Sequence, residues 1–112
     1  MEEKIIRGYL YDFYGQLLNA HQRKIYEAYA FDDLSLSEIA EQEGISRQGV
    51  YDIIRRCTRS LENYEQALHL VARFMKIKED IERIQKLTEG DRVTENSLGE
   101  IRRISRGILE EL

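Results

Sequence analysis

Apolar residues recur at steps of three and four positions along most of the chain, which predicts a succession of amphipathic helices. The first is expected over residues 3–18 and the second over residues 20–31. The apolar stripe of the first helix consists of Ile6, Leu10, Phe13 and Leu17. Tyr9, Tyr11 and Tyr14 broaden this stripe, and we expect them to pack rather than to stack on bases. Because no proline interrupts the helical runs, the pattern favours an all-α fold.

The central segment, residues 34–59 (LSLSEIAEQEGISRQGVYDIIRRCTR), has the layout of a helix-turn-helix. Ser35 and Glu38 stand at capping-box spacing and start its first helix. Gly44 ends that helix at a position where a positive φ costs least. Ser46 then caps a second helix, whose start can enter a major groove. The segment therefore predicts a trihelical helix-turn-helix domain.

The second helix of this motif has one apolar face and one polar, basic face. Val50, Ile53 and Ile54 recur at core spacing and are expected to be buried. Arg47 and Gln48, at the helix start, are expected to meet base edges, and the later arginines to meet phosphates. The residues predicted to contact DNA are Ser46, Arg47, Gln48, Tyr51, Arg55, Arg56 and Arg59.

A long helical run follows the motif. Between Gly49 and Thr88 the chain has neither glycine nor proline, and apolar residues continue at the same spacing. We therefore expect one long helix, continuous with the second helix of the motif. Its apolar face is too broad for burial on a small trihelical core alone, so residues 61–88 are predicted to form a dimerisation helix. Folding of this helix back onto its own domain is the alternative.

Four parts of the chain are expected. They are a helix-turn-helix domain (residues 1–60), the dimerisation helix (61–88), a linker (89–96) and a C-terminal amphipathic helix (97–112). Ser97 and Glu100 stand at capping-box spacing where the last helix begins. This short helix could close the bundle, exchange onto a partner subunit or contact phosphates.

Charge limits the DNA affinity that the fold can be expected to have. The formal net charge is −4 and the pI is near 5.3, so the chain as a whole does not neutralise phosphates. Residues 47–59 contain four arginines and one acid, Asp52, whereas residues 32–43 contain five acids and no base. We therefore expect modest affinity for DNA unless two copies act together.

Several classes of protein are disfavoured by the sequence. No apolar run approaches ~18 residues, which disfavours membrane insertion, and the N-terminal residues do not have the pattern of a signal peptide. The single cysteine, Cys57, forbids an internal disulfide and fits a reducing cytoplasm. His21 and His69 have no cysteine or carboxylate at ligand spacing, so neither a metal nor another cofactor is expected. No catalytic motif is found, so the chain is not expected to be an enzyme.

Part of the motif, from Gln22 to Gln48, is similar to region four of bacterial sigma factors. Over residues 9–75 the chain resembles the YlxM-like family of small bacterial proteins. The matching pieces are Tyr9-Leu10-Tyr11-Asp12-Phe13-Tyr14, Leu17-Leu18, Gln22-Arg23, Asp32-Asp33, Ser35-Leu36, Glu38-Ile39-Ala40-Glu41, Ser46-Arg47-Gln48, Val50-Tyr51-Asp52, Leu61-Glu62 and Tyr64-Glu65. Gly49 stands where the family has alanine, which loosens the helix slightly without altering its surface.

This resemblance implies a cytoplasmic bacterial protein with a sigma-like helix-turn-helix and a connection with the signal recognition particle pathway. We expect a dimeric DNA-binding regulator on the basis of the motif and its exposed basic residues. The alternative is a non-catalytic adaptor that binds protein or RNA components of that pathway. The acidic net charge and the acidic residues 32–43 favour this alternative.

Overall fold

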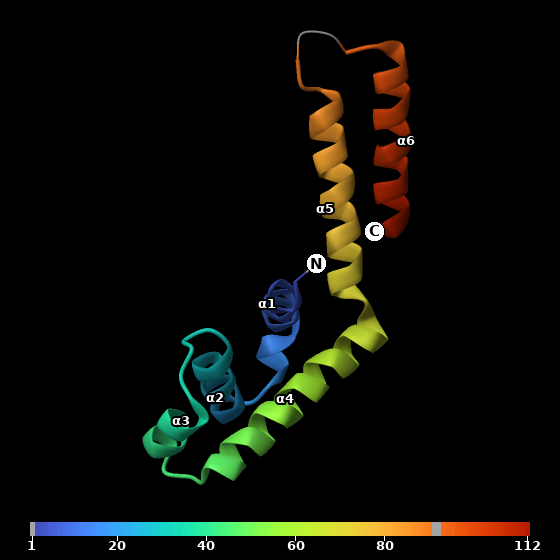
Figure 1. The fold of residues 1–112 in the computed structure, drawn as a ribbon. Coiled ribbons are helices and arrows are strands. Elements are labelled where there is room, and N and C mark those ends of the chain that lie inside the picture. Colours follow the sequence, from blue (N-terminus) through green and yellow to red (C-terminus); the bar gives the residue numbers. More distant parts are fainter. Residues whose placement is uncertain (1, 91–92) are drawn as a thin grey trace. The chain divides into compact units, whose positions relative to one another are not determined.

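The computed structural model describes residues 2–90 and 93–112, and every regular element within them is a helix (Figure 1). The helices are α1 (Glu3–Tyr14), a short 3₁₀ helix (Gly15–Leu17), α2 (Ala20–Ala30), α3 (Leu36–Glu43), α4 (Arg47–Leu68), α5 (Leu70–Leu87) and α6 (Glu95–Glu111). The expected all-α fold is confirmed. The chain forms two compact units, Met1–His69 and Leu70–Leu112, which are described separately below.

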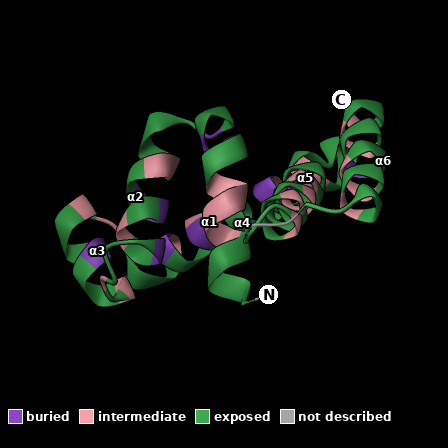
Figure 2. Cartoon of the chain, turned by 90° about the horizontal axis from the view of Figure 1, so that it is seen from above, coloured by how far each residue is buried: buried purple, intermediate pink, exposed green. Residues whose placement is uncertain are grey.

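The first unit is held together by an apolar cluster to which three helices contribute. Ile25 of α2, Ile39 and Ala40 of α3, and Val50 and Ile54 of α4 are all buried in it. These are the residues that the helical periodicity places on the inner faces, and Figure 2 shows the buried positions along these helices. The cluster fixes the positions of α3 and α4 relative to α2.

Helix α1 packs on this assembly mainly through aromatic side chains. Tyr11 stacks on Tyr26 of α2, with ring centroids 5.6 Å apart and ring planes 11° apart. The Tyr11 hydroxyl donates a hydrogen bond to the carboxylate of Glu27. The pKa of Tyr11 is raised to about 12, mainly because the side chain is desolvated by burial and secondly because of this hydrogen bond. Tyr14 is buried, and its hydroxyl donates to Glu65 of α4 at 2.5 Å. These contacts support the expectation that the tyrosines pack in the protein.

The expectation of one continuous helix as far as Thr88 is wrong, because α4 ends at Leu68 and α5 begins at Leu70. His69 lies between them in the left-handed region, with φ 56° and ψ 27°. Its N–H donates to the carbonyl oxygen of Glu65 at 2.8 Å, which closes the last turn of α4. Histidine is one of the few non-glycine residues enriched in this conformation. The stretch predicted for dimerisation is therefore divided between two helices.

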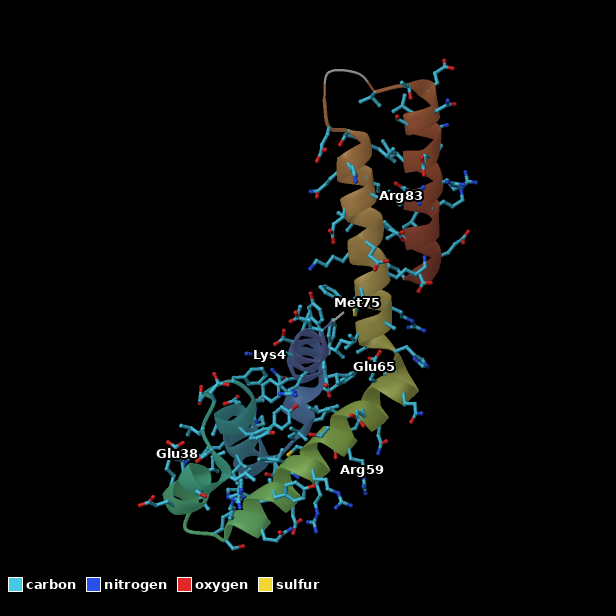
Figure 3. All side chains as sticks on the ribbon, in the orientation of Figure 1. Lys4, Glu38, Arg59, Glu65, Met75 and Arg83 are labelled. Atoms are coloured by element: carbon cyan, nitrogen blue, oxygen red, sulfur yellow. The ribbon has the colours of Figure 1, made fainter. Side chains whose placement is uncertain are left out.

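The second unit is an antiparallel hairpin of α5 and α6 (Figure 1). The predicted capping box of the last helix is wrong: Thr94 caps α6, and its side-chain oxygen accepts the N–H of Ser97 at 3.1 Å. Glu100 instead contacts Arg83 of α5, which Figure 3 labels. Part of the predicted linker, residues 91 and 92, lies outside the described residues.

None of the described helices is both long enough and apolar enough to cross a membrane.

Candidate nucleic-acid interface

Helices α3 and α4 are joined by a tight turn whose backbone is set by local hydrogen bonds. Ser35 Oγ accepts the N–H of Glu38 at 3.1 Å, and the Glu38 carboxylate accepts the N–H of Ser35 at 3.1 Å. Gly44 ends α3 with φ 67° and ψ 32°. Ser46 Oγ accepts the N–H of Gly49 at 2.9 Å and starts α4. The predicted capping box, glycine turn and second cap are all confirmed, so the motif is a helix-turn-helix.

The same substitution at two glycines should have opposite effects. Gly44→Ala places a Cβ in the left-handed region and should lower the free energy of unfolding by about 1–2 kcal/mol. Gly8→Ala, inside α1 where the added Cβ meets no atom of another helix within 4 Å, should raise it by about 0.5–1 kcal/mol. Urea unfolding followed by circular dichroism measures both. Destabilisation by Gly8→Ala equal to that by Gly44→Ala would contradict the role assigned to the turn.

Helix α4 has two chemically distinct faces. Val50, Ile54, Cys57 and Leu61 are buried on one face. All seven residues predicted to contact DNA are exposed on the remainder of the helix and its cap. They are Ser46, Arg47, Gln48, Tyr51, Arg55, Arg56 and Arg59. Figure 3 shows Arg59 projecting outward from α4. The structure therefore brings all these residues to one element, and their contact with DNA stays a prediction.

The exposed side chains of α4 form two rows, because residues four apart lie on the same side of a helix. The first row is Arg47, Tyr51, Arg55 and Arg59. The second row is Gln48, Asp52 and Arg56. A shallow hollow at the helix start is lined by residues of both rows and by Leu36 of α3. A second hollow further along is lined by Arg55, Arg56, Arg59 and Asp52. The first part of this face therefore combines apolar surface from Leu36 and Tyr51 with the hydrogen-bond donors of Arg47 and Gln48. Its later part is mainly positively charged.

Two of the predicted residues also have local partners. Ser46 Oγ accepts the N–H of Gly49, so this side chain caps α4, and its hydroxyl hydrogen can be donated to a phosphate. Gln48 Nε2 donates to the carboxylate of Asp52 at 3.1 Å. This bond holds the amide of Gln48 over the helix surface with its carbonyl oxygen and one N–H available to a base edge. Asp52 is the one acid in either row.

The acidic residues of α3 are partly neutralised by contacts within the first unit. The Glu43 carboxylate lies 3.3 Å from Nζ of Lys24 and 3.8 Å from Nε2 of His21, both on α2. Hydrogen bonds from the backbone and side chain of Ser35 lower the pKa of Glu38, so it is ionised at the N-terminus of α3. Lys24 therefore offsets the charge of Glu43, whereas Glu38 keeps its negative charge.

The structure adds two residues that the sequence did not identify as parts of the site. Leu36 lies beside Tyr51 and lines the hollow at the start of α4. Lys24 offsets the charge of Glu43. Leu36 fits the apolar periodicity of a core residue, so no sequence signal separates it from the core. Lys24 and Glu43 lie on different helices, and their contact depends on how those helices pack.

Cys57 does not belong to the interface. Its side chain is fully buried, and burial raises the pKa of the thiol. The nearby arginines thus do not turn it into a reactive thiolate. Within residues 2–90 and 93–112 no three histidine, cysteine or acidic side chains gather to hold a metal ion.

Comparison with known proteins identifies one family and several relatives within it. A family model described as "Putative helix-turn-helix protein, YlxM / p13 like" matches residues 1–101. The YlxM protein of Bacillus subtilis (strain 168) is 40% identical over 95 residues, covering 85% of this chain and 86% of that protein. A relative from Bacillus licheniformis is 38% identical over 104 residues, covering 93% and 97% of the two chains. A relative from Thermoanaerobacter sp. (strain X514) is 51% identical over 77 residues, covering 69% of this chain and 66% of the relative.

Proposed function

The chain belongs to the YlxM/p13-like family of helix-turn-helix proteins, and from this premise we propose that it is a cytoplasmic DNA-binding regulator that reads a major groove with α4. The observation that carries the proposal is the exposed face of α4, with four arginines, Gln48 and Tyr51 on a helix whose other face is buried. A helix anchored on one face presents a fixed set of side chains to a groove.

The start of α4 would read bases. Arg47 can donate two hydrogen bonds to the O6 and N7 atoms of guanine, and Gln48 can pair with the N6 and N7 edge of adenine. Tyr51 is 47% exposed and lies beside Leu36, so this apolar area can contact the methyl group of a thymine. Sequence preference would therefore come from the first two turns of the helix.

The later arginines would bind phosphates. Arg55, Arg56 and Arg59 line one hollow and carry three of the positive charges of this face. Phosphate contacts position a protein on DNA without reading sequence. Because the net charge of the chain is −4, these few contacts support only modest affinity for a single copy. We therefore propose that two copies bind together.

Two arginine variants test the division of roles. Arg47→Ala should weaken binding to a preferred site by about 1–3 kcal/mol and relax its specificity, whereas Arg56→Ala should weaken binding to all sequences alike. The measurement is a gel-shift titration of each variant on selected and random duplexes at two salt concentrations. Arg103→Ala on α6 is the matched control, because it removes the same charge from an exposed position in the second unit. Absence of binding by the unaltered protein at both salt concentrations would reject the proposal.

A second candidate function is a non-catalytic adaptor that binds protein or RNA components of the signal recognition particle pathway. The acidic net charge and the exposed acids Asp32, Asp33 and Glu41 favour it. Pull-down with the purified particle protein, its receptor and its RNA tests this candidate. Binding to a protein component that changes little with salt would favour the adaptor, whereas a steep salt dependence indicates phosphate contacts. Binding to none of the three components would reject it.

A further inference from the structure

The hairpin of α5 and α6 buries little apolar surface of its own. Among its described residues only Val71 and Ile104 are buried. Large apolar side chains on it are exposed instead: Ile81 by 46%, Leu98 by 53%, Leu109 by 72% and Leu112 by 86%. A unit of this size buries too small a fraction of its surface to be stable alone without further support. These side chains therefore mark a surface that another molecule can cover.

The exposed apolar residues of α6 form one stripe. Leu98, Leu109 and Leu112 lie on one side of the helix, because spacings of eleven and fourteen residues are close to whole numbers of turns at 3.6 residues per turn. The side facing α5 is a different one, since Ile104 is buried there and the neighbouring Ile101 and Ile108 are half-buried. The stripe thus adjoins the seam between the two helices.

The ion pair between Arg83 and Glu100 shows which way the stripe points. It joins α5 to α6 along one edge of their seam. Ile81 lies two residues before Arg83, and Leu98 lies two residues before Glu100. Two residues correspond to about 160° around a helix. Both apolar side chains therefore point to the opposite side of the hairpin from the ion pair. We call Ile81, Leu98, Leu109 and Leu112 the hairpin face.

We propose that the hairpin face pairs with the same face of a second copy, so that two hairpins form a four-helix bundle. Arg102 lies beside Leu98 and Leu109 on the same side of α6, and the exposed charges of Glu82 and Arg106 lie further round their helices, so charged side chains border the apolar positions like the rim of an interface. Helix α6 has 17 residues, so the face is roughly 26 Å long, and two adjacent helices make it about 20 Å wide. Two copies then bury on the order of 1,000 Å² together, the area at which specific interfaces begin.

The choice of a second copy, rather than a different protein, rests partly on the proposed function. A helix-turn-helix protein with a net charge of −4 gains most from pairing two DNA-contacting helices. A symmetric pair is also the commonest oligomer of soluble proteins. The pairing assigned to residues 61–88 on sequence grounds is thereby moved to a surface that α5 and α6 build jointly.

Sedimentation equilibrium of the full chain tests the proposal at tens of micromolar. The unaltered protein should have twice the mass of a single 13.3 kDa chain. Leu109→Glu should weaken self-association at least tenfold, and its helix content should be unchanged because this side chain is already 72% exposed. Asn96→Glu is the matched control. It adds the same charge to an exposed position of α6, about 160° away from Leu98, and should leave the mass doubled.

Three results would overturn the pairing: a single-chain mass for the unaltered protein, a doubled mass for Leu109→Glu with unchanged affinity, or equal weakening by Asn96→Glu. The first of these would leave the face to a different protein. Gel shifts on the same samples keep the two proposals distinguishable. A dimer that binds no duplex would reject DNA binding and retain the pairing, whereas a monomer that binds duplex would do the reverse.

Discussion

Removal of three arginines from the α4 face, by the triple substitution Arg55→Ala, Arg56→Ala and Arg59→Ala, is expected to weaken DNA binding several hundredfold at about 0.1 M salt. Each phosphate contact contributes about 0.9 to the slope of log affinity against log salt concentration. Three lost contacts should therefore lower that slope by about 2.7 and remove a comparable number of log units of affinity at 0.1 M salt. Titrations of a random duplex at four or more salt concentrations measure the slope and the affinity.

The chain offers a control of the same charge. The triple substitution of Lys76, Lys86 and Arg103 by alanine removes three positive charges from exposed positions of the second unit, each about 140° round its helix from Ile81 or Leu98 of the hairpin face. Its effect on affinity should be only a few-fold, since it changes the net charge without touching the proposed interface. Equal losses in the two triple variants would show that binding depends on overall charge, and they would remove the reason for assigning the phosphate contacts to α4.

Ile25→Ala is expected to lower the free energy of unfolding of the first unit by about 2–5 kcal/mol. Ile25 is fully buried and packs with Ile39 and Val50, so the shortened side chain leaves a cavity where three helices meet. Because the same cluster anchors α4, the variant should also bind DNA less tightly near its unfolding midpoint. Urea unfolding at one fixed protein concentration, followed by circular dichroism, measures the change.

Ile5→Ala serves as the comparison. Ile5 is 46% exposed on α1, so its truncation should change stability by only about 0.5 kcal/mol. A loss below about 1 kcal/mol for Ile25→Ala would mean that the cluster is loosely packed and does not fix the helix-turn-helix.

The helix-turn-helix could be predicted from sequence because its signals act within a few residues. Ser35 and Glu38 satisfy each other's backbone groups, and Ser46 caps α4 through a group three residues away. Gly44 meets a conformational requirement of its own backbone. The exposed face of α4 followed from the same periodicity, since the buried positions determine which positions remain outside.

The break at His69 could not be predicted in the same way. A single residue in the left-handed region replaces one helical position, and the spacing of apolar residues continues across it almost unchanged. The start of α6 shows a related difficulty. Thr94 and Ser97 are both good capping residues. Glu100 has the right spacing from Ser97 for a capping box, but in the structure its carboxylate pairs with Arg83. At the start of α6 the contact between Glu100 and Arg83, which lies outside the local sequence, distinguishes two acceptable caps.

The burial of Cys57 has a practical consequence for following the motion of α4. Its thiol is the only one in the chain, and its Sγ lies 4.0 Å from the carbonyl oxygen of Gln22 on the opposing α2. A thiol reagent can modify it only after α4 separates from α2, so the labelling rate reports how often this opening occurs. A duplex that stabilises the closed arrangement would slow the labelling in proportion to its occupancy. The rate at which α4 separates from α2 can therefore be measured through Cys57, without introducing a substitution.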